Sequence, residues 1–224
     1  MTPGLRTTGL RATGLGLVLG ALLTACTVGG HPVGGSADLS AHSVTAADFP
    51  LSGATRVPQT SVKFALGDLI GRPVDAPYNP PECAPAAVSA QGAVIYVVID
   101  TARRASFTTA VTGVDHDLGA VISRAARCPR TVTGDSASAT THIQTQARPA
   151  PSGGPGISTG AILRTEQTGD AASPLLTRTY TLIGQRGDIR VYVQYRWPSA
   201  GDIPADQKTQ LDTLFATALA RAFG

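Results

Sequence analysis

The sequence predicts an α+β fold in which a mainly antiparallel sheet packs against helices in two layers, with one disulfide. Residues 94–99 are a nearly continuous β-branched run, typical of a strand buried on both faces or at the centre of a sheet. Residues 177–185 and 189–197 flank a turn at Gly187 and predict a hairpin. Residues 204–223 carry apolar side chains at helical spacing, so a C-terminal amphipathic helix should cover the sheet.

The other elements follow from local patterns along the first half of the domain. Residues 64–70 have apolar side chains spaced as on a short helix, which Gly71 and Pro73 would end. Residues 73–85 contain five prolines and predict an ordered loop without a regular element.

Two strands and a helix are expected further along the chain. Residues 107–111 predict a second strand, and residues 115–126 predict a helix with aspartates near its start. Residues 140–147 and 161–167 predict strands on either side of a Pro/Gly/Ser loop.

The N-terminus carries the pattern of an export signal. Arg6 and Arg11 form a positive region without an acidic residue, and residues 15–23 are an apolar run too short to span a bilayer. The run ends in Leu-Thr-Ala before Cys26, which resembles the lipobox of bacterial lipoprotein precursors. That resemblance implies a signal peptide over residues 1–25 and a lipid on Cys26, which would anchor the protein on the extracytoplasmic face of the cell membrane. Ordinary secretion and a buried N-terminal helix are the alternatives.

Composition divides the remaining chain into a tether and one domain. Residues 27–45 are rich in Gly, Ser and Ala and hold few large apolar side chains, so residues 26–45 are expected to be a flexible tether. Residues 46–224 are long enough for a single domain. The chain has 18 Lys and Arg against 15 Asp and Glu. Two of these arginines would leave with the signal peptide, and no concentrated basic patch remains, which argues against binding to nucleic acid.

Cys83 and Cys128 are the two cysteines that remain beside Cys26. A single even pair in an exported chain predicts a disulfide between them. A metal site or a reactive thiol is the rival interpretation, but neither cysteine has a CxxC partner or a neighbouring histidine.

One short motif resembles a known group of exported domains. Its residues are Pro80, Pro81, Glu82, Cys83 and Ala84, followed by a second cysteine after a helix, late paired strands and a C-terminal helix. These features are similar to the sensor-like domains of mycobacteria, some of which are lipoproteins and some of which belong to transmembrane serine/threonine kinases. The resemblance covers residues 46–224 and implies a cell-envelope domain that binds a small molecule or lipid. The kinase-linked sensors have a two-disulfide design, whereas only one pair can form here.

Three clusters are candidate sites. Ser158 lies in a Gly-x-Ser-x-Gly motif, but the motif follows a loop and leads into a strand, unlike a nucleophile elbow. His116 lies between two aspartates and is better explained by a helix start. Tyr192, Tyr195 and Trp197 are close together in the last strand and are the candidate ligand-binding residues.

These observations predict no catalytic residue, no metal site and no cofactor. His31, His42 and His142 are scattered and do not form a ligand set with metal spacing. We therefore expect a non-catalytic, membrane-anchored binding or sensor-like domain, whose partners would be a small molecule, a lipid or an envelope protein. A lipid carrier and an envelope hydrolase are the alternatives.

Overall fold

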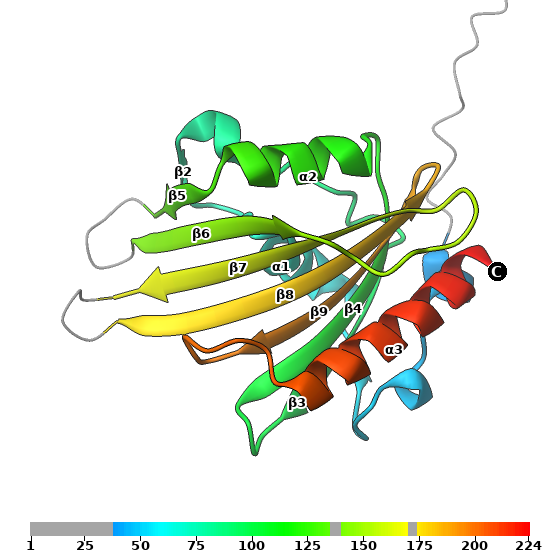
Figure 1. Ribbon diagram of the computed structural model, residues 1–224. Helices are drawn as coiled ribbons and strands as arrows, with labels where there is room; N and C mark the ends of the chain where they lie inside the picture. Colours follow the sequence, from blue (N-terminus) through cyan, green and yellow to red (C-terminus); the bar gives the residue numbers. More distant parts are fainter. Residues whose placement is uncertain (1–37, 135–139, 170–173) are drawn as a thin grey trace, which may run out of the picture. The chain divides into compact units, whose positions relative to one another are not determined.

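A single antiparallel sheet organises the domain in the computed structural model, which describes residues 38–134, 140–169 and 174–224 (Figure 1). The strands are β1 (Thr55–Arg56), β2 (Tyr78–Asn79), β3 (Val94–Asp100), β4 (Ala105–Gly113), β5 (Arg130–Thr133), β6 (Thr141–Arg148), β7 (Ser158–Thr168), β8 (Leu175–Arg186) and β9 (Ile189–Trp197). Their order in the sheet is β1-β3-β4-β9-β8-β7-β6-β5-β2, with every pairing antiparallel. The predicted α+β class, the antiparallel sheet and the disulfide are confirmed.

Helices lie on both faces of this sheet. The α-helices are α1 (Gln59–Ile70), α2 (Leu118–Arg127) and α3 (Ala205–Phe223), and the short 3-10 helices are η1 (Leu39–His42), η2 (Ala46–Asp48) and η3 (Pro81–Cys83). One buried cluster joins α3 to the sheet, and a second joins α1 and α2 to the opposite face. The domain therefore has three layers instead of the expected two, because several strands carry apolar side chains on both sides. We refer below to the α3 face and the α1/α2 face.

The predicted hairpin is the centre of the sheet. β9 has the predicted bounds and pairs along its length with β8 and β4, and Gly187 adopts a left-handed φ of 61° in the turn. The β-branched run at residues 94–99 is β3, but its outer neighbour β1 is only two residues long. Ile99 is 66 % exposed, so this strand is not buried on both faces along its length. A β-branched run reports the tendency to form a strand, not its place in a sheet.

Helix starts differ from the predicted ones, whereas helix ends agree. α1 begins at Gln59 instead of residue 64, because its first turn is polar and exposed and therefore has no apolar periodicity. It ends at Gly71, whose φ is 73° and whose N–H donates to the Asp68 carbonyl. α2 begins at Leu118, with Asp117 as its N-cap. The proline-rich loop after α1 contains the short elements β2 and η3, which the sequence did not predict.

The folded part begins earlier than the predicted residue 46. Leu39 and Val44 are buried in the cluster under α3. The Nδ1 atom of His42 lies 3.0 Å from the Ala222 carbonyl oxygen, and Arg221 forms an ion pair with Asp48 at 3.1 Å. Residues 38–45 therefore belong to the domain. Their composition hides this, because only a few apolar side chains make the long-range contacts.

The predicted signal peptide, Cys26 and residues 27–37 of the predicted tether lie outside the described residues. Among the residues that are described, no helix has both the length and the apolar character needed to cross a membrane.

Candidate functional site

The disulfide joins Cys83 of η3 to Cys128, the residue that ends α2. It connects two cysteines 45 residues apart, with a Cα–Cα distance of 5.7 Å. The predicted pairing is therefore present. Its consequence for function is positional, because the bond holds the proline-rich segment after α1 against the C-terminal end of α2.

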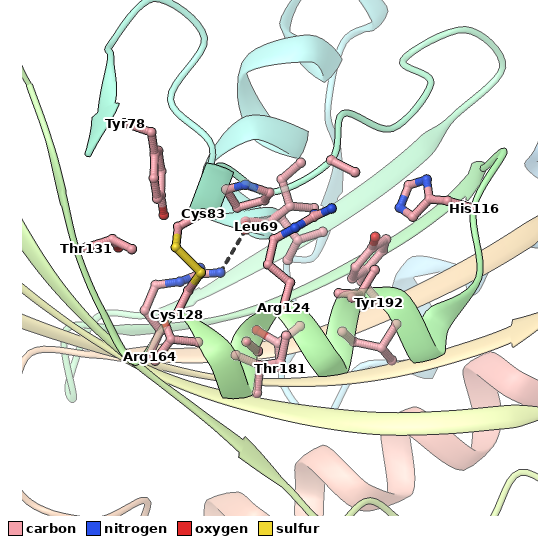
Figure 2. Close-up of a pocket in the computed structure, with 18 of the residues that line it drawn as sticks. Leu69, Tyr78, Cys83, His116, Arg124, Cys128, Thr131, Arg164, Thr181 and Tyr192 are labelled. Carbon is pink, nitrogen blue, oxygen red and sulfur yellow. Dashed lines mark hydrogen bonds between the residues drawn. A yellow bond between two sulfur atoms is a disulfide. The ribbon is translucent and has the colours of Figure 1, made fainter. Parts of the chain in front are cut away.

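A pocket lies beside this disulfide on the α1/α2 face of the sheet (Figure 2). The cavity volume is about 60 Å³, and the wider space between atoms, which includes open solvent, is about 650 Å³. Its apolar wall is formed by Leu69, Ile70, Pro85, Ala86, Val121, Ala125, Ile162 and Ile183, and both cysteines border it. Concave sites with mostly apolar walls and a few polar groups are typical of small-molecule sites.

Arg190 of β9 is a fully buried cation in the polar part of this wall, with 0 % of its surface exposed. Its Nε and Nη2 donate to the Gln185 side chain, and Nη2 also donates to the His116 carbonyl at 2.6 Å. Its Nη1 donates to the Tyr192 hydroxyl at 3.2 Å and to His116 Nε2 at 3.0 Å. These bonds use all five guanidinium N–H groups. All of the acceptors are uncharged groups, so the positive charge has no direct carboxylate partner.

The bond from Arg190 determines the tautomer of His116. Because a guanidinium can only donate, His116 Nε2 must be the unprotonated nitrogen. The proton is then on Nδ1, which donates to the exposed carboxylate of Asp115 at 2.9 Å. The histidine that the sequence places between two aspartates is therefore held at one end of the pocket, in the loop before α2.

Tyr192 contributes a buried phenol at the same end of the pocket. Burial raises the pKa of its hydroxyl, and the adjacent Arg190 guanidinium partly opposes that rise. The hydroxyl oxygen accepts a hydrogen bond from Arg190. Its own O–H has no acceptor among the described residues and remains available as a donor.

Arg164 of β7 lies at the other end of the pocket, with Tyr78, Thr131 and the disulfide (Figure 2). Only 5 % of its surface is exposed, and its Nη2 donates to the Ile70 carbonyl at 2.7 Å. Its Nε and Nη1 have no hydrogen-bond partner within the described part of the chain, and the nearest carboxylate oxygen, of Glu166, is 4.0 Å from Nη1. The hydroxyl of Thr131 is likewise buried without a partner there.

Gly71 explains how the guanidinium of Arg164 fits beneath the end of α1. A Cβ atom at this position would lie 2.2 Å from the Arg164 Cζ atom. The left-handed backbone and this close approach both require glycine. The residue that ends α1 thus also makes room for the buried cation.

Arg124 of α2 is a third cation at the pocket. It is half-buried, and its guanidinium makes no hydrogen bond or ion pair with any described residue, although its carbonyl accepts from the Cys128 N–H. Figure 2 shows its side chain between the disulfide and Tyr192. No Asp or Glu is among the described residues that line the pocket, so the balance of charge there is positive.

The predicted aromatic site is divided between the two faces. Tyr192 lines the pocket, whereas Tyr195 and Trp197 are buried on the α3 face with Phe107. The three side chains therefore do not line one pocket. The alternation of strand side chains could have shown this, because residues three apart in a strand point to opposite faces.

The other sequence candidates lie away from the pocket. Ser158 is exposed at the first position of β7, so its motif leads into a strand as expected. His142 is exposed on β6, His42 packs at the end of α3, and His31 lies outside the described residues. Within residues 38–134, 140–169 and 174–224, no group of three His, Cys, Asp or Glu residues could hold a metal ion.

Sequence reasoning missed the three arginines because they are scattered singly along the chain. A usable signal exists for two of them. Arg164 is two residues from the inward-facing Ile162 and points to the same face of the sheet. Arg190 and Tyr192 are likewise two residues apart and share a face. A charged residue at an inward position of a predicted strand indicates a buried polar site.

Comparison with known proteins finds a likeness in structure but no matching family. No family model and no curated protein matches this chain. An uncharacterised protein from Mycobacterium smegmatis (Rv0999 ortholog) has a similar structure, with a TM-score of 0.40 and 12% sequence identity. The likeness covers 76% of this chain and 85% of the other. At this identity and TM-score it assigns no function.

Proposed function

We propose that this protein is a cell-envelope lipoprotein, anchored through Cys26, whose domain binds a small molecule without chemically changing it. The observation that carries the proposal is the pocket beside the disulfide, where apolar walls surround polar groups that lack partners among the described residues. Buried donors without acceptors cost free energy, and a ligand can supply the acceptors.

The binding role is tested by filling the pocket. Ala125→Phe places a ring where a small side chain borders the space, and Val121→Trp does the same from the preceding turn of α2. Ala126→Phe is the matched control, because Ala126 is exposed on the same helix. The protein is isolated from its native envelope, and native mass spectrometry then identifies any bound molecule.

A molecule that accompanies the wild type and Ala126→Phe, but neither pocket variant, supports the proposal. The same molecule on correctly folded Ala125→Phe and Val121→Trp would contradict it. A co-purifying membrane lipid would favour the carrier alternative within the same pocket. A turnover activity that Ser158→Ala abolishes would instead favour the envelope hydrolase.

The anchor is tested separately at Cys26. Thioether lipidation needs the cysteine sulfur, so Cys26→Ala should release the folded domain from the membrane fraction, whereas Thr27→Ala should remain there. Membrane fractionation and detergent partitioning measure the result. Unchanged membrane association of Cys26→Ala would contradict a lipid anchor on this residue.

A further inference from the structure

We infer that the pocket selects a small amphipathic acid, in which a carboxylate or phosphate is joined to a short hydrocarbon body. This inference rests on the proposed binding function and adds the chemical class of the ligand. The acid group would pair with Arg124 and with the free N–H groups around it, and the hydrocarbon would lie against the apolar wall.

The unused hydrogen-bonding groups in the pocket are mainly donors. Arg124 has five N–H groups, Arg164 has unbonded N–H groups at Nε and Nη1, and Tyr192 has a free O–H. These donors lie at both ends of the pocket, so a ligand that pairs with Arg124 between them must carry acceptor oxygens. Carboxylates and phosphates have this property, and they match the planar fork of a guanidinium.

The charge of the pocket favours the same ligands. Arg190 and Arg164 are buried, and neither has a carboxylate within 3.5 Å in the described part of the chain. Buried charges interact more strongly than exposed ones, because the interior has a lower effective dielectric constant than water. Arg190 has no N–H left for a ligand, yet its charge still attracts an anion. A cationic ligand would be repelled by three guanidinium groups.

The remaining walls require an apolar body. Ile70, Val121, Ile162 and Ile183 present only hydrocarbon to the space, and a polar ligand would lose hydration there without compensation. The confined space favours a short chain or a compact ring. A small inorganic anion would satisfy the arginines but would leave this apolar wall uncovered.

Calorimetric titration with eight-carbon probes tests the chemical class. The protein is the chain carrying Cys26→Ala, which removes the modifiable sulfur and does not alter a described residue. We expect octanoate or octyl phosphate to bind. Octanol should bind at least about tenfold more weakly, because it lacks the charge-assisted hydrogen bonds, and octylammonium should not bind measurably.

Arg124→Gln tests whether Arg124 is the residue that binds the acid group. This variant should lower the affinity for octanoate or octyl phosphate by about tenfold or more and leave the affinity for octanol unchanged. Arg127→Gln is the matched control, because Arg127 lies three residues further along α2, is exposed and does not line the pocket. Thermal melts of both variants verify that the fold is retained.

Two results would overturn the inference. One is the absence of binding by both acids, and the other is equal binding of octanol and the acids. Equal binding of octanol and the acids would still be consistent with a small-molecule pocket. The proposed function itself fails only if filling the pocket does not displace the co-purifying molecule. Equal losses in Arg124→Gln and Arg127→Gln would also contradict the assignment, because they would reflect the general charge of α2.

Discussion

The two faces of the sheet are built from the same strands but are packed differently. On the α3 face, aromatic rings fill the space between sheet and helix: Phe107, Tyr195, Trp197 and Phe215 are all buried there. On the α1/α2 face, Arg164 and Arg190 occupy inward positions and a pocket remains between the sheet and α2. Well-packed hydrocarbon stabilises a fold, whereas a buried cation such as Arg190, which has no carboxylate partner among the described residues, reduces stability.

We propose separate roles for the two faces. β9 illustrates it within a few residues, because Tyr195 points into the α3 core while Arg190 and Tyr192 border the pocket. We interpret the α3 face as the part that stabilises the domain and the α1/α2 face as the part available to a ligand. Substitutions on the two faces should therefore have different effects.

The largest expected effect is on the α3 face. Trp197 stacks on Tyr195 with ring centroids 5.5 Å apart, and its Nε1 donates to the Gly201 carbonyl. Trp197→Ala should lower the free energy of unfolding by about 3–5 kcal/mol, the usual cost of removing a buried aromatic ring. Denaturant unfolding measures this, and octanoate affinity of the folded variant should remain unchanged. A selective loss of affinity without destabilisation would show that the α3 face also binds ligand.

Removal of the disulfide should affect both stability and the pocket. Replacing Cys83 and Cys128 together with alanine should lower the free energy of unfolding by up to about 4 kcal/mol, from the loop entropy of the unfolded chain. Octanoate affinity should also fall, because both cysteines border the pocket. Chemical reduction of the wild type is the matched control. Two titratable thiols at these positions in the unfolded, unreduced protein would contradict the bond.

The smallest expected effect concerns the contact between residues 38–48 and α3. Burial tends to raise the pKa of the Asp48 carboxyl, but hydrogen bonds from Thr45 and Arg221 outweigh it, so its pKa lies below the usual value. A carboxyl whose pKa is lowered by folding stabilises the folded state at pH values above its ordinary pKa. This contribution is lost as the pH falls through the folded-state pKa. Asp48→Asn should therefore cost about 0.5–1 kcal/mol at neutral pH and less in acid.

Urea unfolding of wild type and Asp48→Asn at several pH values measures this difference. Asp75→Asn is the control, because Asp75 is exposed and has no hydrogen bond or ion pair with the described residues. A difference between wild type and Asp48→Asn that persists in strong acid would show that the carboxylate charge is not responsible.

Local patterns in the sequence predict most of the regular elements. The β8–β9 hairpin, the strands β3, β4, β6 and β7, the C-terminal helix and the pairing of Cys83 with Cys128 all follow from local patterns and cysteine number, whereas β1, β2 and β5 were not predicted. A periodicity of 2 or 3.6 residues is visible in the order of apolar and polar residues along the chain, so it can be recognised without knowing the fold. The α+β class follows from the same patterns.

Which distant residues meet depends on the tertiary fold. Arg124, Arg164 and Arg190 come from a helix and two strands, and they converge because β7, β8 and β9 pair beneath α2. The position of β3 near an edge, the burial of Leu39 and the separation of Tyr192 from Trp197 also depend on long-range packing. A local pattern specifies how a segment is shaped and which of its residues share a side, but its partners are selected by burial of the whole chain.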